Sequence, residues 1–376
     1  MSGVIKNYVT KPVIKKGQPD DSFKIQPLPS PAGDYPYHLD LPDGEGHSST
    51  SLVFNMVGDT GGLKSPNFQQ QIAEQMGKQT QDPAYPSQLL YHLGDIVYHF
   101  GEREQYETQF FKPYSSYPAP IYAIAGNHDA DVNLHNRVPY KSLDPFRTVF
   151  CDPRPGDHYF SDQVTRKNQH QPNVYWTLNT ALATIIGLYS NVPKYGYIGE
   201  EQQDWFLKEL ISAGKMQEEK AIIVCLHHAP YTADTNHGSS LAMIDLLEAS
   251  FAKAGVWPDA VFSGHVHNYQ RFSKTYANGK KVPFIVAGSG GFDELHVLAT
   301  TDNPQFTQED PRFENVNLEN YRLHEHGFLK LVLEKTKDKF TLRINYYTME
   351  HEVQAAPLPA TLYDSITLDL KRLTVV

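Results

Sequence analysis

Two histidines, His265 and His267, leave a tight turn one residue apart, directly after the mostly apolar run 259–263 and Gly264. Residues at positions i and i+2 of an extended segment share a face, so both imidazoles can point into one cleft. A single pair of this kind is an ordinary feature of surface loops. Here, however, four upstream segments place polar side chains in the same position, at the end of an apolar run. In chain order these residues are Asp59, Asp95, Tyr98, Asn127, His128, and His227 or His228.

These side chains are oxygen and imidazole donors, with no thiol among them. Imidazole together with carboxylate suits zinc, iron or manganese, whereas magnesium and calcium prefer all-oxygen sites and structural zinc prefers thiolates. The donors are more than one ion needs, but two ions that share a bridging carboxylate would use them all. Ions ~3.5–4 Å apart clamp the attacking and leaving oxygens of an in-line displacement. The pattern therefore predicts a two-metal site.

Apolar runs of strand length precede these residues, and helical stretches lie between the runs. The runs 51–57, 88–93 and 119–125 lead to Gly58-Asp59, Gly94-Asp95 and Gly126-Asn127, and helices are expected at 67–78 and 102–111. Strands that alternate with helices imply a parallel or mixed sheet covered by helices. In such sheets, sites form at the carboxyl ends of the strands, where the polar residues fall.

The rest of the chain continues this pattern. Strands are expected at 173–178, 183–188, 221–226, 259–262 and 282–287, and helices at 200–213 and 241–254. Residues 293–323 are polar and are expected to form a surface excursion, before antiparallel strands at 327–334, 339–348 and 364–370. Residues 1–48 are expected to be an extended arm packed on the surface, with a short strand near 37–41. Residues 49–376 are expected to form one domain, because no linker divides them.

Composition narrows the class of protein. A chain of 376 residues with 23 Tyr and 19 Phe has the material for a sizeable core. The formal net charge of −10 argues against a nucleic-acid-binding surface and against a cationic membrane surface. No segment approaches the ~18–20 consecutive apolar residues of a membrane span. The N-terminus lacks the apolar stretch of a secretory signal, which favours a cytoplasmic location.

Five ordered motifs between residues 59 and 267 together resemble the calcineurin-like metallophosphoesterases. The motifs are Asp59, Gly94-Asp95-Ile96-Val97-Tyr98, Gly126-Asn127-His128-Asp129, Val224-Cys225-Leu226-His227 and Gly264-His265-Val266-His267. The resemblance implies an α/β fold, a four-layer α/β/β/α sandwich of mixed sheets flanked by helices. It also implies that 49–376 is the catalytic domain.

The branch of the family is also indicated. Many relatives carry Asp-x-His in the first motif, but this chain has Asp59-Thr60-Gly61. Its Gly94-Asp95-x-x-Tyr98 block instead resembles the purple acid phosphatases, in which the tyrosine is a phenolate ligand of a ferric ion. A phenolate needs a highly charged metal near neutral pH, because free tyrosine titrates near ~10. Tyr98 would thus replace the ligand that is missing at position 61.

By this resemblance, two ligand sets share Asp95 as the bridge. The first metal, ferric iron, would take Asp59, Asp95, Tyr98 and His267. The second metal, Fe(II), Zn or Mn, would take Asp95, Asn127, His227 and His265. A Val-x-x-His pattern favours His227 as this ligand, whereas a His-x-Pro pattern would select His228. With His227 as the ligand, His228 lines the cleft.

The resemblance further implies that the enzyme hydrolyses a small phosphate monoester by in-line attack of a metal-bound hydroxide. The catalytic residues would be His128 and His237, and the substrate contacts would be Asn127, His128, His228 and His237. His237 lies ten residues after His227, in a loop. Two alternatives stay open: a phosphodiesterase for cyclic nucleotides or phospholipid headgroups, and a non-catalytic binding protein on the same fold.

The chain departs from the family pattern in three respects. Asp129 stands where the third motif more often ends in Glu, at a position that is not a ligand. The short arm lacks the β-sandwich domain of the plant enzymes. Relatives are often exported, so the missing signal leaves the compartment and the identity of the second metal open. The oligomeric state is open as well.

Overall fold

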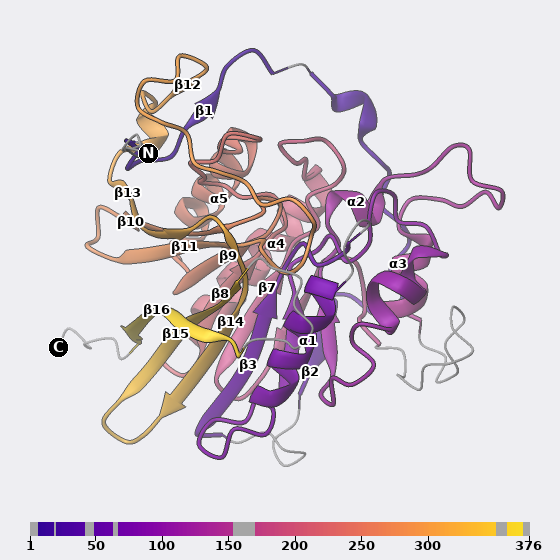
Figure 1. The fold of residues 1–376 in the computed structure, drawn as a ribbon. Helices are drawn as coiled ribbons and strands as arrows, with labels where there is room; N and C mark the ends of the chain where they lie inside the picture. The colour runs from indigo at the N-terminus through magenta and orange to yellow at the C-terminus, as the bar shows by residue number, and fades with distance from the viewer. Residues whose placement is uncertain are drawn as a thin grey trace.

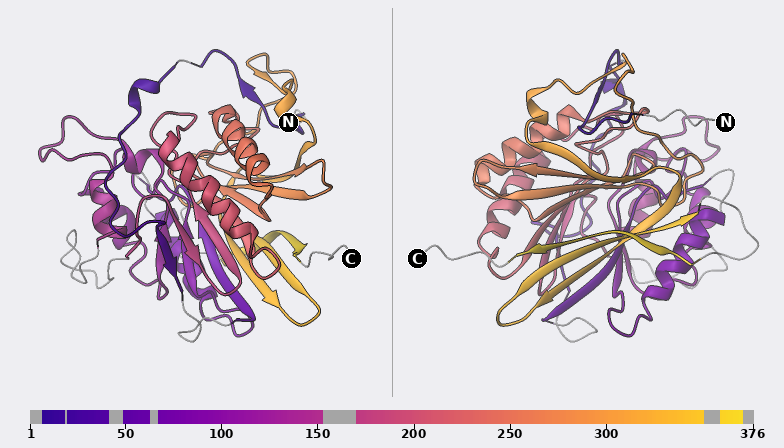
Figure 2. Two further views of the ribbon diagram at one scale, coloured as in Figure 1. Left: turned by 180° about the vertical axis from the view of Figure 1, so that it is seen from behind. Right: turned by 60° about the vertical axis from the view of Figure 1, so that its left-hand side comes forward.

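Two β-sheets pack face to face, and helices cover the outer face of each (Figures 1 and 2). The computed structural model describes residues 7–18, 20–41, 49–62, 67–152, 170–350 and 359–370. Within these residues the arrangement is the expected four-layer α/β/β/α sandwich of mixed sheets, so the predicted fold class is confirmed.

The first sheet joins N-terminal strands to C-terminal ones, in the order β16-β15-β14-β3-β4-β5. Strands β3, β4 and β5 are parallel, whereas β14 is antiparallel to β3. Helix α1, Asn67–Gln79, covers the outer face. The strand bounds are β3 Ser51–Val57, β4 Leu89–His92, β5 Ile121–Ala123, β14 Glu325–Lys335, β15 Phe340–Glu350 and β16 Thr361–Asp369. The C-terminal strands are antiparallel, as expected.

The second sheet has the order β13-β10-β11-β9-β8-β7-β6-β2. Its centre, β7, β8, β9 and β11, is parallel. Helices α4, Glu200–Gly214, and α5, Leu241–Ala254, pack against each other on its outer face (Figure 2). The strand bounds are β2 His38–Asp40, β6 Trp176–Asn179, β7 Ala183–Gly187, β8 Ala221–Cys225, β9 Ala260–Ser263, β10 Tyr269–Thr275, β11 Lys281–Ala287 and β13 Val316–Arg322.

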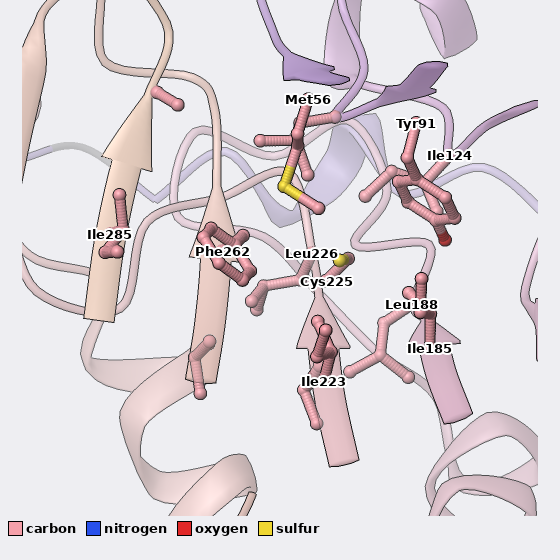
Figure 3. Packing of buried hydrophobic residues seen from close by; sticks show 14 of the residues in the cluster. Met56, Tyr91, Ile124, Ile185, Leu188, Ile223, Cys225, Leu226, Phe262 and Ile285 are labelled. Atoms are coloured by element: carbon pink, nitrogen blue, oxygen red, sulfur yellow. The ribbon is translucent and has the colours of Figure 1, made fainter. Parts of the chain in front are cut away.

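The main hydrophobic core lies between the two sheets (Figure 3). Met56 and Tyr91 from the first sheet face Ile185, Ile223 and Phe262 from the second. Strands β3, β4 and β8 are buried almost throughout, which explains why they read as continuous apolar runs rather than as alternating ones. The core therefore fixes the carboxyl ends of the parallel strands β3, β4 and β5 relative to those of β7, β8, β9 and β11.

Two sequence expectations were wrong in part. The segment 293–323 is more than a surface excursion, because it contains β13, which pairs with β10, and the buried residues Leu298 and Phe313. β13 has a single hydrogen-bonded neighbour strand, and its sequence VNLENYR is correspondingly polar. The expected helix at 102–111 is only a short π-helical turn, Glu107–Phe111. Elsewhere the expected elements lie within a few residues of their predicted bounds, and α3, Asp144–Phe150, adds a short helix.

The described part of the arm is extended and packed on the domain, and its strand β2 lies where a short strand was expected. Residues 1–6, 19 and 42–48 of the expected arm lie outside the described residues, as do 63–66, 153–169, 351–358 and 371–376 of the expected domain. Strand β1, Ile14–Lys15, pairs with β12, Phe306–Thr307. Cys151 and Cys225 are buried and not bridged. Among the described residues, every helix is too short or too polar to cross a bilayer.

Candidate metal centre

The predicted site residues come from both sheets. Asp59, Asp95 and Asn127 follow β3, β4 and β5 of the first sheet, and Tyr98 lies three residues beyond Asp95. His227 follows β8 of the second sheet, and the turn with His265 and His267 follows β9. One sheet therefore supplies the oxygen donors and the other supplies the imidazoles. Both sides of the site depend on the packing of the core between them.

Three site residues have left-handed backbone conformations. The φ angles of Asp59, Asp95 and His265 are 57°, 53° and 67°. For residues other than glycine this region costs of the order of ~1–3 kcal/mol, and such residues are enriched at functional sites. The backbone amide of His265 donates to Oδ1 and Oδ2 of Asp59, at 3.0 and 2.9 Å, and so ties the two sheets together at this point.

Tyr98 is at the centre of a first group of donors and is fully buried. Its hydroxyl oxygen lies 2.9 Å from Oδ2 of Asp95, 3.3 Å from Oδ1 of Asp59 and 3.2 Å from Nε2 of His267. A phenol has a single proton and can donate it to only one of these atoms. The remaining lone pairs face one another, so the group is arranged for a cation.

A second group of donors forms around Asn127, next to the first. Its side-chain oxygen lies 2.9 Å from Nδ1 of His265 and 3.1 Å from Nε2 of His227. Nε2 of His227 is in turn 3.3 Å from Oδ2 of Asp95, the same oxygen that contacts Tyr98. Asp95 therefore belongs to both groups, which is the geometry that a bridging carboxylate requires.

Backbone carbonyls fix the orientation of all three imidazoles. Nδ1 of His227 lies 2.9 Å from the carbonyl of Leu93, and Nδ1 of His267 lies 3.0 Å from that of Glu294. Nε2 of His265 lies 3.0 Å from the carbonyl of Lys194. Only an N–H can serve a carbonyl, so the opposite nitrogen of each neutral ring carries a lone pair directed into the site. The rings are thus presented as metal ligands, and the donor set fits two cations.

The charge of the site leads to the same conclusion. Asp59 and Asp95 are buried, and neither has a Lys or Arg partner in the described part of the chain. Burial raises the pKa of Asp59 to about 7. Burial by itself would lower the pKa of His227, but Asp95, Asp59 and the carbonyl of Leu93 together raise this pKa to about 9. Buried carboxylates are costly unless a positive charge is paired with them. Bound cations would provide that charge.

His227 and His228 have different surroundings. His227 lies between Asp95 and Asn127, as described above. Nδ1 of His228 is instead 2.7 Å from the hydroxyl oxygen of Ser190, and its ring is packed 4.3 Å from that of His265. Its Nε2 is buried and has no hydrogen-bond partner among the described residues. The structure therefore brings His227 into the donor cluster and places His228 beside it, against the ring of His265.

The two predicted catalytic histidines lie against different members of the cluster. The ring of His128 lies 4.4 Å from that of Tyr98, and its Nδ1 is 2.6 Å from the carbonyl of His99. His128 is the second residue of helix α2, Asn127–Ala130. The ring of His237 lies 4.2 Å from that of His265. One histidine is therefore next to each donor group.

Sequence reasoning missed two supporting residues. The side chain of Gln109 holds the backbone of Tyr98, accepting from its amide at 2.8 Å and donating to its carbonyl at 2.7 Å. Asp129, treated only as a departure from the family pattern, accepts from the amides of Gly126, Ile96 and Val97 at 2.8–3.2 Å. It thereby links the second and third motifs. Asp129 stands inside a motif and so had a signal, whereas Gln109 stands outside the five motifs, in the segment Glu107–Phe111, and had none.

Gly61 lies against Tyr98. A Cβ atom added at position 61 would lie 2.7 Å from Cδ2 of Tyr98 and 2.5 Å from Oε1 of Gln109. Both distances are far below van der Waals contact. The ring of Tyr98 and a side chain at position 61 therefore compete for the same space, which gives a steric reason for their exchange.

Comparisons with known proteins assign the chain to a family. A family model described as calcineurin-like phosphoesterase matches residues 53–269. Tartrate-resistant acid phosphatase type 5 of Oryctolagus cuniculus is 26% identical over 274 residues, which cover 67% of this chain and 76% of that protein.

Two solved structures share the fold. Purple acid phosphatase PPD1 from yellow lupin (Lupinus luteus) seeds has a TM-score of 0.58 at 16% identity, covering 86% of this chain and 54% of that one. GAP50, the anchor in the inner membrane complex of Plasmodium, has a TM-score of 0.56 at 13% identity, covering 86% of this chain and 90% of that one. The chain spans about half of the lupin protein.

We expect Gly61→Ala to lower the free energy of unfolding by about 1–3 kcal/mol, because the methyl group must displace Tyr98 or Gln109. Gly77→Ala in α1 is the matched control, since a Cβ there meets nothing within 4 Å. The control should be more stable than the wild type by about 0.4–1 kcal/mol. Urea unfolding of the three proteins measures both effects. A Gly61→Ala variant as stable as the wild type would contradict the steric argument.

Proposed function

The chain belongs to the calcineurin-like phosphoesterase family, and we propose that it hydrolyses phosphate monoesters at a dinuclear metal centre. The observation that carries this proposal is the convergence of buried lone-pair donors around the shared carboxylate of Asp95. The acid phosphatase relative supports the monoester preference within the family.

We assign the ligands as two sets that share Asp95. Asp59, Asp95, Tyr98 and His267 would hold a ferric ion, and Asp95, Asn127, His227 and His265 would hold Fe(II), Zn or Mn. The phenol of Tyr98 supports the choice of iron for the first set, because only a strongly charged cation would remove its proton: burial, together with Asp95 and Asp59, raises its pKa well above the ordinary value.

Bound cations would polarise the phosphate and lower the pKa of a water so that it can attack at neutral pH. The chain's own residues would bind and orient the ester. His128 is held by the carbonyl of His99 beside one metal set, and His237 lies beside the other. From these positions they would donate to phosphate oxygens or to the leaving oxygen. Asn127 would contact both a metal and the substrate, and His228 would line the cleft beside His265.

A non-catalytic role on the same fold is the alternative. GAP50 is described as an anchor, so the fold itself does not require catalysis. Against that role, each expected ligand position holds a donor, and each ring is oriented by a carbonyl. A cytoplasmic location and the domain bounds 49–376 stay predictions.

The purified, metal-loaded protein should hydrolyse p-nitrophenyl phosphate with a kcat/KM at least ~10-fold above that for bis-p-nitrophenyl phosphate, a difference of ~1.4 kcal/mol in barrier. Asp95→Asn should lose this activity, whereas Asp259→Asn, a buried carboxylate paired with Lys280 elsewhere, should keep it. A strong preference for the diester would replace the proposed activity with that of a phosphodiesterase. No hydrolysis of either ester would favour the binding role.

Iron-loaded protein should show a visible phenolate-to-iron absorption that disappears in Tyr98→Phe. Tyr91→Phe is the matched control, because Tyr91 is equally buried but lies in β4 within the core, and the variant should keep the band. The band and the metal content are measured on the same samples. A colourless wild type that binds two metals per chain would show that Tyr98 is not a ligand of ferric iron.

His227→Ala should lose one of the two bound metals after dialysis, since it removes a nitrogen that faces Asp95 and Asn127. His228→Ala should keep both metals, because its ring contacts Ser190 and packs behind His265. Elemental analysis of the two variants decides between them. Metal loss in His228→Ala alone would reverse the ligand assignment.

A further inference from the structure

A second cluster of titratable side chains adjoins the proposed metal ligands. It consists of Asp234, His237 and His296, whose donor atoms lie within 4.8 Å of one another. Asp234 is fully buried. Its Oδ2 lies 3.3 Å from Nδ1 of His237 and 3.4 Å from Nδ1 of His296. The cluster therefore has the composition of a metal site, but its hydrogen bonds indicate another role.

The carboxylate of Asp234 is already saturated by its own loop. It accepts from the amide of Asn236 at 2.9 Å, from that of His237 at 3.1 Å and from that of Gly238 at 3.0 Å. The hydroxyl of Thr232 adds a further contact at 3.3 Å. A cation at this carboxylate would have to displace these donors, so the carboxylate is arranged to hold the loop rather than a metal.

The nitrogen of His296 also has a partner other than Asp234. Its Nδ1 accepts from the backbone amide of His267 at 3.2 Å. A ring nitrogen that accepts carries no proton and cannot donate to a carboxylate as well. Of the two rings, His237 is then the one that donates to Asp234. The cluster divides into a His296–His267 contact and an Asp234–His237 hydrogen bond.

The rings of this cluster pack on the two imidazoles of the His-x-His turn. The ring of His237 lies 4.2 Å from that of His265, and the ring of His296 is stacked 4.3 Å from that of His267. The rings of His237 and His296 are 5.1 Å apart. His237 therefore sits directly against a proposed ligand of the second metal, where its orientation bears on what it can contact.

The backbone of the His237 loop has further anchors besides Asp234. Val13 of the arm donates to the carbonyl of Thr232 at 2.9 Å and accepts from the amide of Ser239 at 2.7 Å. The hydroxyl of Tyr195 donates to the carbonyl of His237 at 3.0 Å. The loop thus keeps anchors on both sides of His237 when Asp234 is replaced, whereas the hydrogen bond to the ring of His237 comes from Asp234.

We propose that Asp234 is a positioning residue that orients His237 for contact with the substrate phosphate, a role that rests on the proposed function. The hydrogen bond from Nδ1 of His237 to Asp234 fixes the rotation of the ring and leaves Nε2 on the side away from the carboxylate. Burial by itself would raise the pKa of Asp234, but the hydrogen bond from His237 contributes to holding this pKa well below its ordinary value. The carboxylate is therefore charged and a strong acceptor.

A double-variant cycle tests the proposal. Asp234→Asn and His237→Gln should each lower kcat/KM for p-nitrophenyl phosphate by about 10–100-fold, as expected for a misplaced contact group. The double variant should be no worse than His237→Gln, because Asp234 acts only through that ring. The second readout is calorimetric binding of orthophosphate to the metal-loaded proteins, where the dissociation constant should rise about tenfold in all three variants.

The controls separate orientation from folding. Asp259→Asn, which removes another buried carboxylate, should leave both readouts unchanged, and each variant should retain the metal content of the wild type. Asp234→Ser, which keeps an oxygen for the loop amides, is a second variant and should behave like Asp234→Asn. If neither Asp234 variant folds, Asp234 is structural and the proposal is wrong.

The cycle also separates this proposal from the proposed function. Losses that multiply in the double variant, in either readout, would overturn the role of Asp234, because the two residues would then act independently. A wild type that binds orthophosphate but hydrolyses neither ester would refute the proposed function alone. In that case the binding cycle still decides whether Asp234 orients His237.

Discussion

The site depends on buried negative charge and lone pairs that no Lys or Arg side chain of the described residues neutralises. Asp59, Asp95 and Tyr98 converge with the imidazole of His267 in a space from which water is largely excluded. Without a cation, this convergence would oppose folding, because desolvated carboxylates repel one another. The left-handed backbone at Asp59, Asp95 and His265 adds to the cost. The packing of the core between the sheets must therefore offset both the repulsion between the carboxylates and the strained backbone of these residues.

The division of ligands between two sheets follows from the fold. Parallel strands of both sheets end at the same edge of the sandwich, so oxygen donors from β3–β5 meet imidazoles from β8 and β9. The amide of His265 donates to Asp59 and already joins the two sides. Cations bound between them would strengthen the same connection. Metal binding would therefore contribute to the stability of the whole sandwich as well as to chemistry.

Much of the fold and the positions of the site residues were predictable, because glycine followed by Asp, Asn or His after an apolar run marks a strand end. The pairing of β10 with the polar edge strand β13 was not, since β13 lacks the continuous apolar run of the central strands. The sequence also did not predict that the carbonyls of Leu93, Lys194 and Glu294 orient the imidazole rings. Any residue type can supply a carbonyl, so no sequence pattern marks them. Sequence alone also left His227 and His228 open, whereas the surroundings of the two rings distinguish them.

The contact between Gly61 and Tyr98 has an evolutionary consequence. A side chain at position 61 and the ring of Tyr98 require the same space. If Tyr98 is a ligand as proposed, a lineage that exchanges it for a side chain at position 61 passes through an intermediate that is either overfilled, with both groups present, or short of a ligand, with neither. The two solutions are therefore separated by a fitness valley that single substitutions do not cross easily. Positions 61 and 98 should accordingly change together among relatives, and the pair is a more discriminating marker of lineage than either residue alone.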